Sequence, residues 1–456
     1  MTVTMPPLFN DRQFYRGLFA LAIPIMLQNL VNTLVNMLDT IMVGRLGTVE
    51  IAALGLGNQV FFLYNIILFG ICSGGAIFTA QFWGKGDIPG IRKNLGFCLT
   101  LNLAVAVLFT LGAAFFPEVL IGVYSRDQAV IRVGAAYLRI ISFSLIPFAV
   151  STAFVLTLRS VEKVRLAIVG SVIALLLNGV LNYLFIFGKG PIPAMGVEGA
   201  ALATVIARYV ETLVLVIVSY SLRYTPAGRL RELFGFNRYY ARQFFRVTLP
   251  VIANEIFWSL GITVQNIIFA RTDTESIAAF NITGTVSQLT WVLFMGLGNG
   301  VAVLIGKKIG EQDEKTARDY ASRIVRFAPL LSLGAAMILF YLSRFLPFVF
   351  NVNPQTLNAA SQMFIILCCS YPFKAFNMSM VIGICRAGGD TVFCVVYDLV
   401  MMWFVALPLA AFAAFVLKTP VWIIYLCVIM EEPLKAILGL WRFKSGKWLH
   451  NVTIGL

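Results

Sequence analysis

Residues 17–43, GLFALAIPIMLQNLVNTLVNMLDTIMV, form a long apolar run that contains no lysine or arginine. A helix that crosses the hydrocarbon core of a bilayer needs about 20 apolar residues. Over the whole chain of 456 residues, 59% are hydrophobic and only 12% are charged, whereas soluble proteins average about 25% charged residues. This composition excludes a cytosolic enzyme, a secreted disulfide scaffold and a disordered regulator, and it predicts a polytopic membrane protein.

The rest of the chain repeats this pattern between breaks that carry turn residues, such as residues 84–87 and 188–191. We therefore expect an all-α integral membrane protein with twelve transmembrane helices. The first apolar run is too long for the hydrophobic part of a signal peptide, which predicts a retained helix. The predicted spans lie near residues 17–43, 51–81, 95–116, 132–156, 166–187, 197–220, 247–270, 277–306, 327–346, 357–383, 392–416 and 420–441.

An internal repeat divides the chain into two halves. Residues 24–92 align without a gap with residues 250–318, a shift of 226 positions, and the shift pairs identical residues that hydrophobic bias alone would not match. Each half has six spans, so both halves cross the membrane in the same orientation, and we expect two pseudo-symmetric six-helix lobes related as a parallel repeat. The matched pairs include Pro24 with Pro250, Arg45 with Arg271 and Asp87 with Asp313.

This repeat predicts the domain organisation. We expect an N-lobe of helices 1–6 at residues 1–220, a cytoplasmic basic linker at 221–246, and a C-lobe at 247–456 that holds helices 7–12 and a C-terminal tail.

The formal net charge of +14, from 35 Lys and Arg against 21 Asp and Glu, reports orientation rather than a nucleic-acid partner. Basic residues concentrate at the N-terminus and in every second loop, while the alternate loops hold few of them. Because basic loops stay on the cytoplasmic side, we expect a multi-pass protein of the cell inner membrane with both termini in the cytoplasm. The most basic loop is the linker, with Arg223, Arg229, Arg231, Arg238, Arg242 and Arg246.

Several chemistries are excluded by residues that the chain lacks. Its seven cysteines have no zinc-ligand or disulfide-framework spacing, and His450 is its only histidine, which argues against a Ser-His-Asp site, a His-ligated zinc and a His proton relay. No GxxxxGK[ST] loop is present, so no ATPase on this chain drives it. We expect no cofactor and no enzymatic activity.

A carboxylate at the centre of a membrane helix costs about 2.5–3.5 kcal/mol on insertion scales, which makes it a candidate functional residue. Asp39 lies late in the first span, with Asn36 three residues earlier on the same helical face. This one-sided polar stripe predicts that Asp39 points into a cavity of the protein and binds a cation or proton. The alternative is a buried acid paired to a nearby donor.

Glu255 is the second candidate. It follows Pro250 by five residues, and a proline inside a helix frees a backbone carbonyl. A carboxylate near freed carbonyl oxygens could bind Na⁺ or hold a proton. The alternative is an acid near the helix end that reaches the lipid headgroups.

The remaining polar residues of the spans carry weaker signals. Asp398, Glu431, Glu432 and Lys435 are secondary candidates, although Glu431 and Lys435 are four apart and can form a structural ion pair. Glu211 with Arg208 has the same structural interpretation. Asn178 and Asn182 share a helix face, and Thr204 could add a hydroxyl to the same cavity; interhelical hydrogen bonding is the alternative.

One stretch carries a family resemblance. Asp39-Thr40-Ile41-Met42-Val43-Gly44-Arg45-Leu46-Gly47, followed by Ile51-Ala52-Ala53, resembles the signature of spans 1 and 2 in the multidrug and toxic compound extrusion (MATE) family. The resemblance implies a two-lobed antiporter of twelve helices that exports drugs in exchange for H⁺ or Na⁺.

The resemblance also implies roles for single residues. Asp39 matches the family's N-lobe cation-binding or protonation residue, Pro24 the proline of helix bending, and Asn178 and Thr204 the polar residues of spans 5 and 6. The chain departs from the family where it has Asn182, because that pattern has aspartate there. Glu255 looks like the glutamate through which some members bind the cation in the C-lobe.

We therefore expect a cation-coupled multidrug efflux antiporter that works by alternating access as a monomer in membrane lipid. Its substrates would be small cationic or amphipathic molecules, exchanged for H⁺ or Na⁺ at Asp39 or Glu255. Helix bending would occur at Pro24 and Pro250. The first alternative is a flippase of lipid-linked precursors from the same superfamily. A polytopic enzyme of lipid metabolism is a weaker alternative, because no clustered catalytic motif is present.

Overall fold

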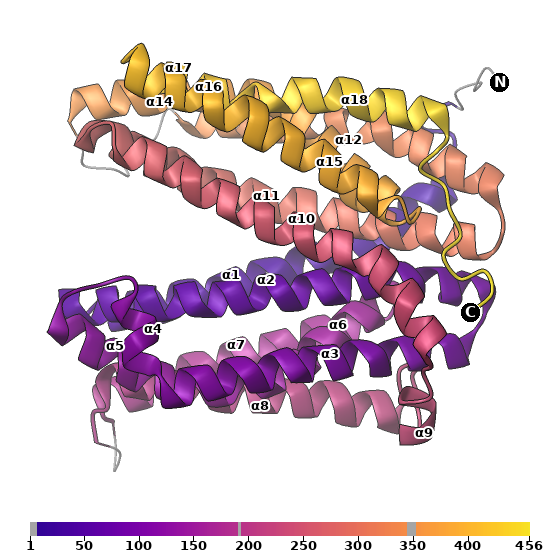
Figure 1. Ribbon diagram of the computed structural model, residues 1–456, viewed down its shortest axis with the longest axis horizontal. Helices are drawn as coiled ribbons and strands as arrows, with labels where there is room; N and C mark the ends of the chain where they lie inside the picture. Colours follow the sequence, from indigo (N-terminus) through magenta and orange to yellow (C-terminus); the bar gives the residue numbers. More distant parts are fainter. Residues whose placement is uncertain (1–6, 190–192, 344–352) are drawn as a thin grey trace. The chain divides into compact units, whose positions relative to one another are not determined.

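The computed structural model describes residues 7–189, 193–343 and 353–456, and helices make up nearly all of their regular structure (Figure 1). Contacts divide the chain into two compact units. The N unit comprises residues 27–248. The C unit comprises the residues up to Met26 together with 249–455.

The N unit holds the later part of α1 and the next helices along the chain. Within it α5 continues through a 3₁₀ turn into α6, so that residues 128–160 form one span. The bounds are α1 Arg12–Val43, α2 Thr48–Lys85, α3 Ile88–Phe115, α4 Pro117–Gly122, α5 Gln128–Ile141, α6 Leu145–Ser160, α7 Val164–Phe187, α8 Gly196–Ser221 and α9 Leu230–Leu233.

The C unit holds most of α10 and all later helices. Three stretches have π-helical geometry, at Ser379–Arg386, Met402–Ala406 and Phe412–Val416, and such widened turns are frequent at functional sites. The bounds are α10 Arg238–Ala270, α11 Thr274–Gly310, α12 Glu314–Ser343, α14 Pro354–Met378, α15 Thr391–Met401, α16 Leu407–Ala411, α17 Val421–Ile429 and α18 Glu431–Ser445.

Eleven helices of the described residues are long and apolar enough to cross a membrane. The twelfth predicted span, near 420–441, is divided into α17 and α18 at Met430. Pro433 explains this break, because its ring clashes with the carbonyl four residues earlier, at Ile429, where α17 ends. The end of the span predicted near 327–346 lies outside the described residues.

The internal repeat is visible in the way equivalent helices begin. Asp87 caps α3 by accepting a hydrogen bond from the Gly90 amide at 2.9 Å, and its partner in the repeat, Asp313, accepts one from the Thr316 amide at 3.1 Å before α12. Gly86 and Gln312, one residue before each aspartate, both have positive φ angles of 74° and 60°. The two halves therefore share turn geometry as well as hydrophobic pattern.

The chain passes from one unit to the other inside α1 and again inside α10. Pro24 lies in α1 just before the boundary at Met26, and Pro250 lies in α10 just after the boundary at Thr248. The grouping of residues up to Met26 with the C unit differs from the predicted N-lobe of 1–220. Its cause is packing, because the backbone of Ala22 lies against Gly300 of α11. The predicted lobe and linker boundaries stay a prediction.

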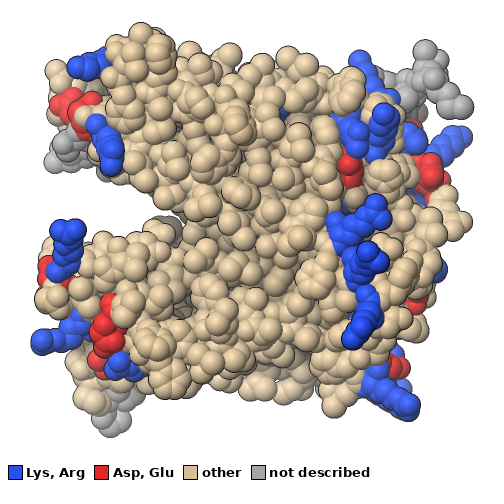
Figure 2. Space-filling model, in the orientation of Figure 1, with Lys and Arg blue, Asp and Glu red and all other residues tan. Residues whose placement is uncertain are grey.

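Charged side chains are sparse on the spans. Figure 2 shows that, within each unit, most visible Lys, Arg, Asp and Glu side chains lie towards the helix ends, with uncharged side chains between them. Many apolar side chains of the spans are exposed, such as Leu176, Phe404 and Ile437. Exposed apolar side chains along the spans suit contact with lipid rather than water.

Candidate functional site

Asp39 of α1 lies inside a cluster of neutral polar side chains in the N unit. Its Oδ1 accepts a hydrogen bond from Asn182 Nδ2 at 2.5 Å, and its Oδ2 lies 3.5 Å from the Thr204 hydroxyl, which donates to it. Asn178 joins the cluster by accepting from Asn182 and donating to Thr204, each at 3.1 Å. Asp39 is only 8% exposed and forms no ion pair with any residue that the structure describes. A buried carboxylate is thus held by neutral donors alone.

The cluster contains three of the four residues predicted to share a cavity with Asp39. α7 supplies Asn178 and Asn182 one turn apart, and α8 supplies Thr204. Asn36 is not brought in: its side chain is exposed, and no hydrogen bond of the described residues joins it to Asp39.

Arg208 and Glu211 of α8 lie beside this cluster and were predicted only as a structural pair. The pair is present, with Arg208 Nη1 2.8 Å from Glu211 Oε2. Arg208 follows Thr204 by one helical turn and acts electrostatically on Asp39. The four-residue spacing from Thr204 to Arg208 was the signal that could have revealed this charge near Asp39.

Gln28 carries a buried network that sequence reasoning missed. Its side-chain amide donates to Ser171 Oγ at 3.1 Å and to the Ala167 carbonyl at 3.2 Å, and its carbonyl accepts from Arg159 at 2.7 and 3.0 Å. Ser171 in turn donates to Glu211 at 2.9 Å. All bonding capacity of Gln28 is used, so α1 is fastened to α6 and α7 one turn after Pro24.

Glu255 of α10 is committed to an ion pair in the C unit. Its Oε1 lies 2.7 Å from Arg386 Nη2, and both side chains are largely buried. Arg386 ends the π-helical stretch after α14. Because a full positive charge already neutralises this carboxylate, it is less suited than Asp39 to hold a further cation.

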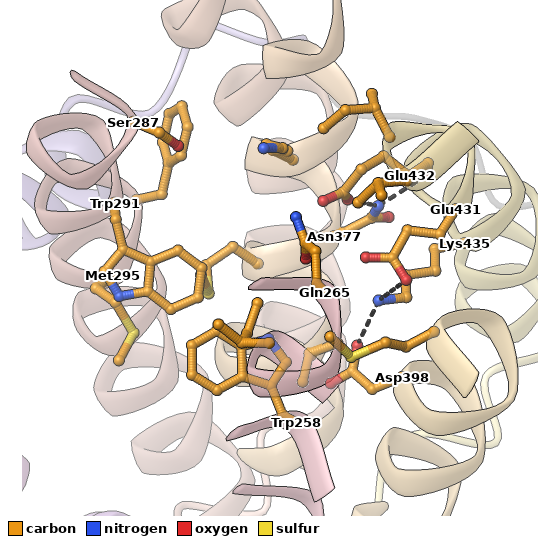
Figure 3. A pocket seen from close by; sticks show the side chains of 18 of the residues that line it. Trp258, Gln265, Ser287, Trp291, Met295, Asn377, Asp398, Glu431, Glu432 and Lys435 are labelled. Carbon is orange, nitrogen blue, oxygen red and sulfur yellow. Dashed lines mark hydrogen bonds and ion pairs between the residues drawn. The ribbon is translucent and has the colours of Figure 1, made fainter. Parts of the chain in front are cut away.

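The secondary candidates form a second charged group in the C unit (Figure 3). Lys435 Nζ lies 3.3 Å from Asp398 Oδ1 and 3.3 Å from Glu431 Oε2. Glu432 accepts a hydrogen bond from Asn377 Nδ2 at 2.7 Å. The predicted pair of Glu431 and Lys435 is therefore present, with Asp398 as an additional partner that the sequence did not indicate.

These groups line a cavity of about 270 Å³ in the C unit. Its wall combines charged side chains with aromatic ones, including Trp258, Trp291 and Tyr371. The volume is just below the usual range for small-molecule pockets, about 300–1,000 Å³. The described residues contain no group of three or more His, Cys, Asp or Glu side chains that could hold a metal ion.

Comparison with known proteins gives these sites a context. The family model described as MatE matches residues 24–184 and 250–412, which covers both halves of the repeat. The chain belongs to this family. It is a multi-pass membrane transporter and not an enzyme, and its two six-helix lobes have the fold of MATE transporters.

Individual relatives are distant but match over nearly the whole chain. A relative in Thermotoga maritima, named "Probable multidrug resistance protein NorM", is 25% identical over 96% of this chain and 94% of its own. A crystal structure of MATE in complex with MaL6 has a TM-score of 0.86 at 19% identity, and covers 95% of this chain and 97% of that one.

A second solved structure, from Pyrococcus furiosus, has a TM-score of 0.84 at 20% identity, with 95% of this chain and 97% of that chain covered. It is described as a MOP superfamily transporter in which reverse polarity of the binding pocket suggests a different function. At these identities both structural matches speak to the fold alone.

Proposed function

We propose that this protein is a multidrug efflux antiporter of the cell inner membrane that exchanges a monovalent cation, H⁺ or Na⁺, for cationic or amphipathic compounds. Membership of the MatE family and the name of the Thermotoga relative support this class of transport. Both termini would lie in the cytoplasm, because basic residues concentrate at the N-terminus and in every second loop.

The observation that carries the proposal is the environment of Asp39. Asp39 is buried, its hydrogen bonds come from neutral donors, and the nearby Arg208 is already paired with Glu211, so a proton, a sodium ion or a cationic substrate can supply the counter-charge that Asp39 lacks. Binding of one of these cations excludes the others, and this competition is the basis of exchange. Asn178, Asn182 and Thr204 offer further oxygen atoms to a bound cation.

Pro24 gives α1 a means to respond to the bound cation. The segment after Met26 belongs to the N unit, where Gln28 and Asp39 contact α7. Bending of α1 at Pro24 would open or close the Asp39 cluster as its charge changes, with Pro250 as the related weak point of α10.

The test is efflux of a cationic dye from proteoliposomes under separately imposed H⁺ and Na⁺ gradients. We expect Asp39→Asn to lower gradient-driven efflux by about 100-fold or more, because the neutral side chain cannot exchange a cation. The matched control is Glu118→Gln, an acid whose side chain is 58% exposed and lies outside the cluster. Undiminished efflux by Asp39→Asn would refute the proposal, and failure of both gradients to drive wild-type efflux would favour a flippase.

A further inference from the structure

The cavity of the C unit has an aromatic side and a charged side. Trp258 of α10 and Trp291 of α11 stack with ring centroids 5.4 Å apart and an interplanar angle of 14°. Figure 3 shows the two indoles across the pocket from Glu431 and Glu432. Stacked indoles offer a flat apolar surface on which a further aromatic ring can pack.

The charged side contains four carboxylates and three basic groups. Two of the basic groups are already used, because Arg386 pairs with Glu255, and Lys435 is shared by Asp398 and Glu431. These contacts leave one basic and one acidic group of the lining without an ion pair.

Those two groups are Lys374 and Glu432. Within the described part of the chain, Lys374 has neither a hydrogen bond nor an ion pair, although Glu432 and Glu431 act on it electrostatically. Glu432 is bonded through Oε2 to Asn377, while its Oε1 has no hydrogen-bond partner among the described residues. Asn377 follows Lys374 by three residues on α14, so both unpaired charges belong to one wall of the cavity.

The lining contributed by α10 holds a buried acceptor. Asn254 is 2% exposed, lines the cavity, and donates its amide hydrogen to Asp398 at 3.1 Å. Its Oδ1 has no hydrogen-bond partner among the described residues. A buried polar atom without a partner costs free energy that a ligand donor would recover.

We propose that this cavity binds a compact aromatic zwitterion, whose carboxylate pairs with Lys374, whose ammonium pairs with Glu432, and whose ring packs on Trp258 and Trp291. A zwitterion satisfies both unpaired charges at once. A simple cation would leave the ammonium of Lys374 unpaired, and a simple anion would face four carboxylates. The small volume favours a ligand of about the size of an aromatic amino acid.

This site is independent of the cation exchange proposed at Asp39, so binding can be measured without a gradient. The probes are tryptophan, tryptamine and indole-3-propionate, which share the indole ring and differ only in the charges that they carry. Isothermal titration calorimetry on the purified full-length protein in detergent gives each dissociation constant.

For the wild-type protein we expect tryptophan to bind about tenfold or more tightly than either analogue, because each lost ionic contact removes a charge-assisted hydrogen bond. Asp39→Asn is expected to bind tryptophan as the wild type does, whatever it does to transport. Equal binding of tryptophan and tryptamine, or no binding of any probe, would overturn the proposal.

Two variants then assign the two contacts. Lys374→Met should weaken tryptophan binding about tenfold while tryptamine binding changes less than about twofold, and Glu432→Gln should weaken tryptophan while indole-3-propionate is spared. Cys369→Ser, on an exposed position of the same α14, is the matched control and should leave all three constants unchanged. If Lys374→Met weakens tryptophan and tryptamine equally, its role is structural and the assignment is wrong. The three-probe series on wild-type protein decides the proposal even if a variant fails to fold.

Discussion

In each half of the molecule an arginine contacts the residue five positions after the helix proline. That residue is Asn29 after Pro24 and Glu255 after Pro250, so the two arginines have different partners. In the N unit Arg159 Nη2 donates to Asn29 Oδ1 at 3.2 Å, and no acid pairs with it among the described residues. In the C unit Arg386 lies 2.7 Å from Glu255. Asn29 and Glu255 are equivalent in the repeat.

Acidic residues occupy different positions in the two halves of the repeat. In the N unit the hydrogen-bond partners of Asp39 are neutral, and its equivalent in the C unit is Gln265. Conversely, Glu255 is paired with arginine where the N unit has Asn29. The two halves share their helices but differ in their charges. The N unit holds a buried carboxylate, Asp39, with no ion pair among the described residues, and the C unit has ion pairs around a cavity.

The largest effect is expected from breaking the ion pair of the C unit. Glu255→Gln should lower the free energy of unfolding by about 3 kcal/mol, because it leaves the buried guanidinium of Arg386 without its carboxylate. The midpoint of thermal unfolding in detergent measures this loss. The double variant Glu255→Gln/Arg386→Gln should recover much of it, and a double variant less stable than the single one would contradict the interpretation.

A smaller loss is expected at Lys435. Lys435→Met removes the positive charge shared by Asp398 and Glu431, but the two carboxylates keep 17% and 14% exposure and can gain water from the cavity. We expect about 2 kcal/mol of destabilisation by the same thermal measurement. Lys308→Met, which breaks an exposed pair with Glu311, serves as the control and should cost under about 1 kcal/mol. Equal losses at the two lysines would be inconsistent with a buried charge network.

The cation site proposed at Asp39 can be strengthened instead of broken. Asn182→Asp adds a second carboxylate next to Asp39 and should increase the apparent affinity for the coupling cation about tenfold, because the two negative charges repel unless a cation lies between them. The measurement is the cation concentration that gives half-maximal dye efflux in proteoliposomes.

The control for this variant is a second buried asparagine of the N unit, away from Asp39. Asn102 of α3 bonds to Cys72 and to the Ala149 carbonyl, so Asn102→Asp tests whether any added buried acid has the same effect. We expect it to leave the half-maximal cation concentration unchanged. If Asn102→Asp also changed the half-maximal cation concentration about tenfold, the effect of Asn182→Asp would not be specific to the position next to Asp39.

The smallest effect tests the arginine comparison directly. Asn29→Glu would give Arg159 the partner that Glu255 gives Arg386, and should raise the stability of the protein by about 1 kcal/mol. A rise in the thermal midpoint of a few degrees is the expected result. Asn29→Gln, which adds length without charge, should leave the midpoint unchanged, and a rise as large as that of Asn29→Glu would show that charge is irrelevant there.

Sequence patterns identified the Asp39 cluster well because its members are local pairs on neighbouring helices. Asn178 and Asn182 share a face of α7, and Thr204 lies on α8, which packs directly against it. Asn36 does not reach the cluster because of its position around the axis of α1. Gln28 and Asp39 are eleven residues apart, about 20° more than three full turns, so they share the face that contacts α7, whereas Asn36 is rotated from Asp39 by about 60°.

Partners distant in sequence could not be predicted. Glu255 and Arg386 come from α10 and the π-helical stretch after α14, and neither residue's own helix indicates the other. The same is true of Gln28 with Arg159. Their pairing depends on how helices pack and on where a π turn widens the helix, neither of which leaves a spacing in the sequence.

The sequence by itself determined the membrane class and the repeat and singled out Asp39 as a candidate, because hydrophobic runs, identical residues in register and a carboxylate inside an apolar span have physical consequences wherever they occur. The tertiary structure alone decided which acids are compensated. Compensation depends on a distance of about 3–4 Å between groups on different helices, and it separates the neutral cluster of Asp39 from the paired Glu255 and from the cavity with Lys374 and Glu432.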